Sequence, residues 1–345
     1  MSLPTAPPAG VIRCVKPKIL VVGCGSIGER HLRCFQRTGR AEPVACEPRA
    51  EILQRIKSTY NVPGFATLEE AWAGGRYDAV VICAPAQMHV AMAKDCLRRG
   101  LHVLIEKPLS ISLDGVNDLV QAVAASGKFV RVGYTWHFHA GVKALRDCLK
   151  SRELGRPLQV VVTSGQHFPT FRPAYREIYY TRHESGGGAI QDSMTHNVNT
   201  VEWLVGPTTR VFCEAAHQAL EGVTVEDTVN AVARNGDVLV SYSHNQFQPP
   251  NETTFLVHCE NGSLKFESHE QRWAKWPRGA EAWQYQAATL KERDDMFVSQ
   301  ANDFLDGMLD GKPGDMCTVP EAAQTLKFNL AALESWRTGK AVEIR

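Results

Sequence analysis

The chain has 345 residues, of which 44% are hydrophobic and 22% charged, and its formal net charge is +1. This length allows two domains with sizeable cores, and the near-neutral charge gives no electrostatic reason to expect nucleic acid or an anionic membrane as a partner. No apolar run is long enough to span a bilayer. Residues 1–16 begin with a Pro/Ala-rich stretch without an apolar signal core, which we expect to be a disordered tail.

Ten cysteines lie far apart along the chain, and none forms a Cys-x-x-Cys pair. Most of them fall inside apolar runs. Buried free thiols in a reducing cytoplasm explain this distribution better than a disulfide framework or a zinc site. We therefore expect a cytoplasmic protein with no bound metal.

Short apolar runs alternate with amphipathic helical patterns in the first part of the chain, residues 17–133. The expected strands are Lys18–Val22, Pro43–Cys46, Ala79–Cys83, His102–Ile105 and Phe129–Val132. The expected helices are Gly28–Thr38, Arg49–Tyr60, Leu68–Ala73, Met88–Arg99 and Leu113–Ser126. This alternation predicts βαβ units and a doubly wound parallel sheet with helices on both faces.

The pattern changes near Tyr134. After a helix at Gly141–Ser151, a long segment and one further helix precede several β-rich runs. These runs are Arg210–Ala215, Thr228–Arg234, Val238–His244, Thr253–Cys259 and Ser263–Glu267. Asn235-Gly236 and Asn261-Gly262 separate such runs, and Asn-Gly is a strong hairpin signal. Two helical patterns, Asp294–Leu309 and Pro320–Arg337, follow the ambiguous residues 280–291. Residues 134–345 therefore read as an α+β domain with an open, mostly antiparallel sheet.

The first expected strand ends in Gly23-x-Gly25-x-x-Gly28, and a helical pattern follows directly. A strand that stops at such a turn directs backbone N–H groups and a helix N-terminus at one spot, which attracts a pyrophosphate. Glu47 closes the next strand about 20 residues on, where a carboxylate accepts hydrogen bonds from ribose hydroxyls. The combination favours a dinucleotide site over a purely structural turn.

Glu47 also bears on which dinucleotide would bind. A carboxylate at this position repels a 2′-phosphate and favours NAD. Arg49 lies two residues away and would pair with that phosphate instead, so NADP remains the alternative.

Glu106-Lys107-Pro108 follows the fourth strand of the expected sheet. Ligands of such sheets lie beyond the carboxyl ends of the strands, so Lys107 would place an ammonium beside a nicotinamide and a substrate oxygen. The alternative is a surface lysine at a strand end.

Gly186-Gly187-Gly188 opens a helical stretch that carries Asp192 and His196. The two residues are four apart and share one helix face, about one turn from each other. A histidine beside a carboxylate is a candidate proton acceptor with a tuned pKa. The alternative to a catalytic pair is that the aspartate caps a helix and that the histidine is a core residue with internal hydrogen-bond partners.

These segments together resemble the Gfo/Idh/MocA family, the glucose–fructose oxidoreductase and inositol dehydrogenase group. The resemblance rests on the Gly23–Gly28 turn, Ala84-Pro85 with His89, Glu106-Lys107-Pro108, and the triple glycine with Asp192 and His196. It implies a Rossmann domain over residues 17–133 and a substrate-binding α+β domain over 134–345. The latter domain often forms subunit contacts, so we expect a homodimer or homotetramer through its sheet. The implied activity is NAD(P)-dependent oxidation or reduction of a sugar, polyol or related secondary alcohol.

The resemblance also implies roles for individual residues. Lys107 would polarise the substrate oxygen, His196 would be the general acid/base, and Asp192 would orient it or share its proton. The expected coenzyme contacts are Gly23, Gly25, Ser26, Ile27, Gly28, Glu47, Ala84, Pro85, His89 and Glu106. The expected contacts to a small-molecule substrate are His137, Tyr179, Arg182 and Asn197.

Tyrosines and arginines crowd the segment before the triple glycine, namely Arg172, Tyr175, Arg176, Tyr179, Tyr180 and Arg182. Their rings and guanidinium donors suit a polyhydroxylated or carboxylated ligand. A solvated loop is the alternative.

Two positions depart from the pattern of the family. Asn199 stands where many members carry Asp, and the segment 134–139 lacks an Arg that members often have. The resemblance therefore does not transfer a particular substrate. His137 and His139 are spaced like a weak metal-ligand pair, for which packing is the alternative.

Two other functions share these motifs. One is a glycoside hydrolase that oxidises its substrate transiently, and the other is a non-catalytic, dinucleotide-binding regulator. Intact Lys107, Asp192 and His196 argue against a pure binding protein, which does not need them.

Overall fold

The computed structural model describes residues 16–345, so the expected N-terminal tail lies outside the described residues apart from Lys16. The first sheet has seven strands: β1 (Lys18–Val22), β2 (Glu42–Cys46), β3 (Gly64–Phe65), β4 (Ala79–Ile82), β5 (His102–Ile105), β6 (Val130–Val132) and β15 (Cys317–Thr318). Their order is β15-β6-β5-β4-β1-β2-β3, and every pair is parallel except β15 with β6. The predicted doubly wound sheet is confirmed, and its strand order reverses between β1 and β4.

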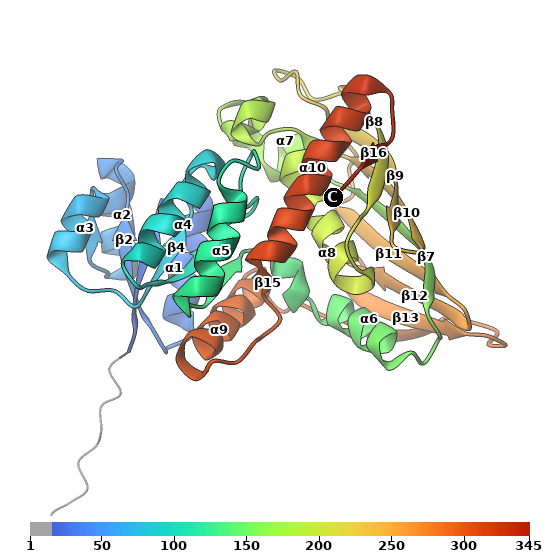
Figure 1. Cartoon of the computed structure of the whole chain (residues 1–345), viewed down its shortest axis with the longest axis horizontal. Coiled ribbons are helices and arrows are strands. Elements are labelled where there is room, and N and C mark those ends of the chain that lie inside the picture. Colours follow the sequence, from blue (N-terminus) through green and yellow to red (C-terminus); the bar gives the residue numbers. More distant parts are fainter. Residues whose placement is uncertain (1–15) are drawn as a thin grey trace, which may run out of the picture.

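Helices cover the first sheet, as Figure 1 shows. They are α1 (Ser26–Arg37), α2 (Ala50–Tyr60), α3 (Leu68–Gly74), α4 (His89–Arg98) and α5 (Val116–Ser126). Central strands such as β4 are completely buried along their whole length. A parallel strand covered on both faces needs apolar residues at every position, which is why these runs show no alternation.

The second sheet has nine strands, in the order β14-β13-β12-β11-β7-β10-β9-β8-β16. Their bounds are β7 (Pro157–Gly165), β8 (Arg210–Ala216), β9 (Thr228–Asn235), β10 (Val238–Asn245), β11 (Glu252–Cys259), β12 (Gly262–Glu267), β13 (Arg272–Pro277), β14 (Gln284–Ala287) and β16 (Val342–Glu343). Only β7 and β10 are parallel, so the predicted antiparallel character is confirmed. Both Asn-Gly pairs form the expected hairpins, β9–β10 and β11–β12.

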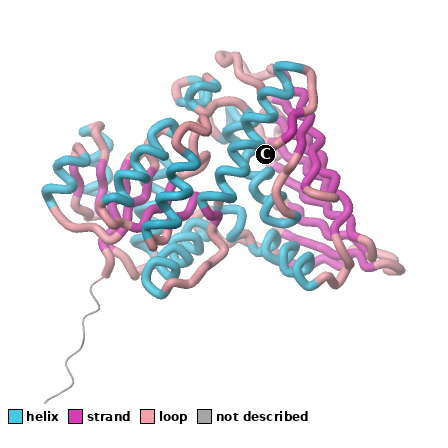
Figure 2. The backbone as a smooth tube through the Cα atoms, viewed as in Figure 1, coloured by secondary structure: helices cyan, strands magenta, loops and turns pink. Residues whose placement is uncertain are grey.

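One face of the second sheet is covered and the other is open. Residues of β8 and β9 alternate between exposed and buried, as a half-covered sheet requires. Helices α6 (Ala140–Ser151), α8 (Thr195–Val205) and α10 (Val319–Thr338) lie on the side that faces the first sheet. Figure 2 shows the strands bordering this layer on one side only.

Strand β7 lies at the centre of the second sheet and was not predicted from the sequence. Its inward residues Val160 and Val162 are almost completely buried. Its partners β10 and β11 follow about 80 to 95 residues later in the chain, so no local turn or hairpin signal marks it. The edge strand β14 has no local sequence signal either, because all of its residues are exposed and it has no apolar periodicity.

The C-terminal part of the chain returns to the first sheet. Helix α9 (Asp295–Asp310) packs against α1, and Asp294 accepts hydrogen bonds from Arg33 at 2.5 and 2.9 Å. Strand β15 then pairs with β6. These long-range contacts tie the two units together. Within residues 16–345, no helix combines the length and the apolar character that crossing a membrane requires.

Candidate active site

A cavity of about 970 Å³ opens between the two units at the carboxyl ends of β1, β4 and β5. The first unit lines it with the Gly23–Gly25 turn, Glu47, the Ala84-Pro85 pair and Lys107. The second unit lines it with residues of β7, β10 and the start of α8. Ligands of doubly wound sheets bind at this edge, beside the point where the strand order reverses.

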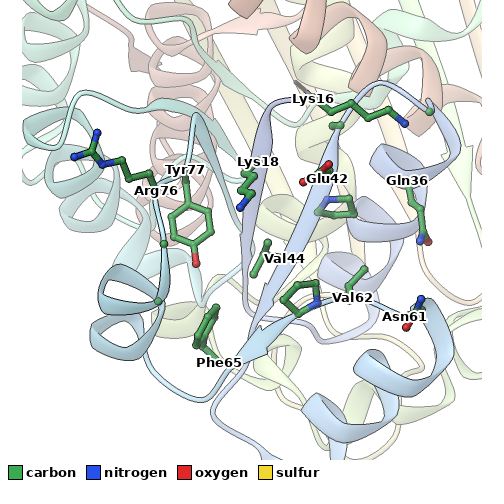
Figure 3. Close-up of a pocket in the computed structure, with 16 residues that line it drawn as sticks. Lys16, Lys18, Gln36, Glu42, Val44, Asn61, Val62, Phe65, Arg76 and Tyr77 are labelled. Carbon is green, nitrogen blue, oxygen red and sulfur yellow. The ribbon is translucent and has the colours of Figure 1, made fainter. Parts of the chain in front are cut away.

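A smaller hollow of about 480 Å³ lies at the opposite edge of the first sheet (Figure 3). Lys18 and Glu42, the first residues of β1 and β2, line it together with Phe65 and Tyr77. It contains none of the expected site residues. We therefore place the candidate site in the larger cavity.

The glycine turn is built by close backbone contacts. Gly23 has a φ of +83°, and a Cβ added there would lie 2.7 Å from the Cys83 carbonyl oxygen. A Cβ on Gly28 would lie 1.8 Å from the Gly23 carbonyl oxygen. Gly25 differs, because a Cβ there would meet only an Arg49 nitrogen at 3.6 Å. The backbone of Gly25 is thus open to the cavity, as the approach of a phosphate requires.

Other residues of the turn have different surroundings. Helix α1 begins at Ser26, which is exposed, and Ile27 lines the cavity. The N-terminus of α1 therefore lies beside the open backbone of Gly25.

Glu47 is buried and lines the cavity at the end of β2. Its carboxylate accepts hydrogen bonds from the Cys24 backbone N–H at 2.8 Å and from Arg49 Nε at 2.6 Å. Burial would raise the pKa of Glu47, but Arg49 and the two backbone donors hold it below its usual value. Glu47 is thus a charged acceptor at the position where an adenosine ribose would lie.

His89 and Glu106 line the cavity but are held by internal partners. The ring nitrogens of His89 lie 2.9 Å from the Pro108 carbonyl oxygen and 2.7 Å from that of Ala84. Glu106 Oε1 lies 2.6 Å from His31 Nε2, and Oε2 accepts the Lys107 backbone N–H. Both side chains therefore fix the strand ends around the cavity.

Lys107 and Asp192, which are 85 residues apart, meet in the cavity wall. Lys107 Nζ donates to the Asp192 carbonyl oxygen at 2.8 Å and lies 3.3 Å from Asp192 Oδ1. Tyr179 donates its hydroxyl hydrogen to the same Oδ1 at 2.6 Å. His196 also lines the cavity, and its ring packs edge-on against Tyr134.

Asp192 lies in a π-helical turn, Ile190–Met194, rather than in the regular helix that the sequence indicated. Buried Glu226 helps to set this turn by accepting the Ile190 backbone N–H at 2.9 Å. Gly188 is needed beside it, because a Cβ there would lie 2.5 Å from that carboxylate. Such turns are frequent at functional sites. The turn leads directly into α8, where His196 is the second residue.

Charge distribution keeps Asp192 ionised and His196 neutral. Burial would raise the pKa of Asp192, but Lys107, Arg172 and the Tyr179 hydroxyl hold it below its usual value. Burial lowers the pKa of His196 well below its usual value, and the Lys107 ammonium lowers it further. Asp192 Oδ2 and His196 Nδ1 are buried and have no hydrogen-bond partner among the described residues. The imidazole is therefore in the form that accepts a proton.

A chain of neutral polar groups forms the wall contributed by the second sheet. The ring nitrogens of His244 lie 2.8 Å from Ser164 Oγ and 2.7 Å from Ser193 Oγ. Asn197 donates to Ser164 Oγ, and Gln246 donates to Ser193 Oγ, both at 2.7 Å. Burial lowers the pKa of His244 to about 4, so one ring nitrogen donates while the other accepts. Such groups match substrate hydroxyls, which also donate and accept.

The structure brings together only part of the expected substrate contacts. Tyr179 and Asn197 line the cavity, whereas Arg182 is exposed outside it. Arg172, from the same segment, lines the cavity instead. Ser164, Ser193 and His244 also line the cavity and were not predicted from the sequence. The β-branched run at residues 160–163 was the one available signal for the strand that carries Ser164.

His137 lies outside the cavity. It is buried, its Nδ1 lies 2.8 Å from the Asp315 carbonyl oxygen, and its ring stacks on Trp203 at 4.1 Å. Its near neighbour His139 accepts the Gly141 backbone N–H at the start of α6. The packing alternative for this pair therefore holds, and the expected substrate contact of His137 is wrong.

The phosphate-binding type of turn, the acid after β2 and the cleft between the two sheets define a two-domain, dinucleotide-binding protein. Comparison with known families gives the same class. The oxidoreductase family model with an NAD-binding Rossmann fold, Gfo/Idh/MocA, matches residues 17–134, and a C-terminal domain of this family matches residues 142–265. The chain belongs to the Gfo/Idh/MocA family, and its first domain is an NAD-binding Rossmann fold.

Curated relatives share this family at moderate identity. The chain is 28% identical over 200 residues to a 1,5-anhydro-D-fructose reductase of Ensifer adhaerens, covering 57% of this chain and 59% of the relative. It is 29% identical over 194 residues to an inositol 2-dehydrogenase of Burkholderia multivorans, covering 55% and 54%. These matches thus span little more than half the length of the relatives.

A solved structure shows that the likeness of fold extends over nearly the whole chain. An oxidoreductase from Agrobacterium radiobacter, in complex with NAD+, L-tartaric acid and magnesium, superposes with a TM-score of 0.85 at 15% identity. The match covers 96% of this chain and 99% of the other. At this identity the likeness concerns the fold alone.

Proposed function

We propose that this protein transfers a hydride between NAD and a secondary alcohol or ketone carbon of a sugar, a polyol or a related small molecule. The observation that carries the proposal is that Lys107, which pairs with buried Asp192, and His196 line the cavity that also contains the glycine turn. Oxidation of an alcohol needs a proton acceptor at the oxygen while hydride leaves the carbon. A neutral imidazole and an ammonium beside one cavity meet that need.

The residues divide the chemistry between them. NAD supplies the hydride acceptor when it is bound. Lys107 donates a hydrogen bond to the substrate oxygen and stabilises the negative charge that develops there. His196 accepts the hydroxyl proton and returns it in the reverse direction. Asp192 holds the ammonium in place through its carbonyl and carboxylate oxygens.

We also propose that NAD is preferred to NADP. Arg49 Nε already donates to Glu47 at 2.6 Å, so binding a 2′-phosphate through Arg49 would disrupt an existing ion pair. The remaining Glu47 charge would repel the phosphate.

The proposed activity is tested by mixing the purified protein with sugars, polyols and sugar acids in the presence of each coenzyme. We expect a net absorbance change at 340 nm with at least one substrate. A glycoside hydrolase with transient oxidation gives product without that net change. A non-catalytic regulator binds coenzyme but converts nothing, and either result would contradict the proposal.

The open face of the second sheet supports assembly with a second copy of this chain, as a homodimer or homotetramer. Phe212 and Val232 are paired neighbours on β8 and β9, and their side chains are 39% and 57% exposed. Leu239 on β10 is 50% exposed on the same face. Adjacent exposed apolar side chains on an open sheet are typical of a protein interface.

Light scattering after size-exclusion chromatography tests the assembly. We expect a mass of two or four chains, which Val232→Lys should reduce. Gln54→Lys, at an exposed position of α2 in the first unit, is the control. A wild-type monomer would contradict the proposal.

A cytoplasmic location is also proposed, since the nine cysteines in residues 16–345 are all free. Fractionation of the source cells tests it. Recovery of the protein outside the cytoplasmic fraction would contradict this location.

A further inference from the structure

We propose that the substrate carries a carboxylate group and that Arg172 binds it. This inference rests on the proposed function and narrows its substrate class to hydroxylated acids, such as uronates and aldonates. It assigns the specificity role to Arg172, one of the six tyrosines and arginines before the triple glycine, because this arginine lines the cavity.

Arg172 is oriented toward the catalytic cluster. It directly follows the short helix α7 (Phe168–Phe171), and its guanidinium carbon lies 5.5 Å from the ring centroid of buried Phe168. Its Nη1 lies 3.9 Å from Asp192 Oδ1. The side chain is 41% exposed and lines the cavity. It is therefore positioned by neighbours yet accessible to a ligand.

Asp192 does not satisfy the Arg172 guanidinium. Oδ1 of Asp192 already accepts the Tyr179 hydroxyl and contacts Lys107, and 3.9 Å is too long for a hydrogen bond. Two other arginines of the chain are fully paired. Arg33 makes two hydrogen bonds to Asp294, and Arg49 makes two to Glu47. The planar guanidinium group of Arg172 can therefore donate two parallel hydrogen bonds to a second carboxylate.

The side chains of Lys107, Arg172 and Asp192 together carry an excess of one positive charge. Lys107 and Arg172 are cations, and within residues 16–345 Asp192 is the one carboxylate that forms an ion pair with either side chain. Burial keeps His196 neutral by lowering its pKa and keeps Tyr179 neutral by raising its pKa. A charge withdrawn from water is stabilised by an opposite charge with good hydrogen-bond geometry. A substrate carboxylate supplies that charge, whereas a neutral polyol does not.

The cavity wall contributed by the second sheet suits the hydroxyl groups of such a substrate. Ser164, Ser193, Asn197 and His244 present neutral donors and acceptors to the same cavity. These groups match hydroxyls. In the reaction, the substrate CH–OH carbon gives a hydride to NAD+ and its hydroxyl proton goes to His196, which leaves a ketone, NADH and an unchanged carboxylate.

The test uses pairs of probes that differ in the acidic group: D-glucuronate with D-glucose, D-galacturonate with D-galactose, and D-gluconate with D-sorbitol. The measured quantity is kcat/KM with NAD+ for wild type, Arg172→Met and Arg172→Lys. We expect wild type to prefer the acid in at least one pair. Loss of a charged hydrogen bond should lower the acid-to-neutral ratio in Arg172→Met by about 10- to 100-fold, mainly through KM, with Arg172→Lys between the two.

Arg176→Met is the matched control, because Arg176 lies in the same segment but contacts Glu221 outside the cavity. It should leave the ratio as in wild type. Thermal unfolding and NADH titration of each variant show that a change in the ratio is not a loss of folding.

Two outcomes overturn the inference in distinguishable ways. If neutral probes react as well as acids, or if Arg172→Met lowers both members of a pair equally, the carboxylate assignment fails while the proposed function stands. If a wild-type protein that binds NADH converts none of the six probes and none of the compounds in the wider screen of sugars, polyols and sugar acids, both the assignment and the proposed activity fail.

Discussion

The two walls of the cavity are built in different ways. The coenzyme wall is mostly backbone: a turn with two glycines that touch neighbouring carbonyls, and the ends of consecutive strands. The substrate wall is made of side chains from β7, β10, α8 and the segment at residues 172–179, which are far apart in the chain. A site made of backbone can be recognised in the sequence from a short motif. A site made of side chains forms only when the folded sheet brings distant segments together. Substitutions should therefore act differently on the two walls.

Removing the ammonium group of Lys107 should have the largest effect on activity. It should lower turnover while leaving coenzyme binding nearly unchanged, and so distinguish the two walls most clearly. We expect Lys107→Met to lower kcat by about 10²- to 10³-fold, because the developing negative charge on the substrate oxygen loses its donor. The NADH dissociation constant, measured by fluorescence titration, should change much less. Lys94→Met, at a half-buried lysine of α4 that pairs with Asp118 outside the cavity, is the control. Wild-type turnover in Lys107→Met would remove Lys107 from the mechanism.

Two glycine substitutions should show how the coenzyme wall depends on backbone contacts. Gly28→Ala forces a Cβ against the Gly23 carbonyl, so we expect it to cost roughly 1–3 kcal/mol of unfolding free energy in urea. Gly25→Ala has space in the free protein and should unfold like wild type, yet bind NADH more weakly. Equal unfolding free energies for the two variants would contradict this account.

Changing the acid after β2 should alter the choice of coenzyme with a smaller effect. In Glu47→Gln the repulsion of a 2′-phosphate disappears and Arg49 loses its charged partner. We expect the ratio of NADP to NAD affinity to rise about tenfold in calorimetric titrations. Glu42→Gln, at the exposed start of β2, should leave the ratio unchanged. Tighter binding of NADP than of NAD by wild type would refute the proposed preference.

The pH dependence of oxidation should reveal the state of His196. Burial and the Lys107 charge lower the pKa of His196 below the ordinary value of 6.5. The proton acceptor is lost only when the pH falls through that lowered pKa, so kcat/KM should stay level from pH 8 to pH 6.5 and fall about tenfold per unit below the pKa. His196→Gln should lack this acid limb. A decline that begins between pH 8 and pH 7 would show that the imidazole is not shielded in this way.

Sequence and structure agree best where a signal is local. The Gly23–Gly28 turn, Glu47 and Lys107 each follow a strand within one alternating pattern, and all three positions fall on the cavity. The two Asn-Gly hairpins were predicted for the same reason. The sequence named Arg182 where the fold brings Arg172 into the cavity, because the irregular segment between them has no periodicity that tells one side from the other.

The sequence by itself determined the strand–helix alternation, the phosphate-type turn and the residue types available for hydride chemistry. These features depend on neighbours within a few residues. Only the tertiary structure decided that β7 lies between β10 and β11, that a buried Glu226 sets the π-helical turn under Asp192, and that His137 packs on Trp203 outside the cavity. Each of these depends on contacts between segments dozens of residues apart, whose pairing follows from the burial of whole faces and leaves no local pattern.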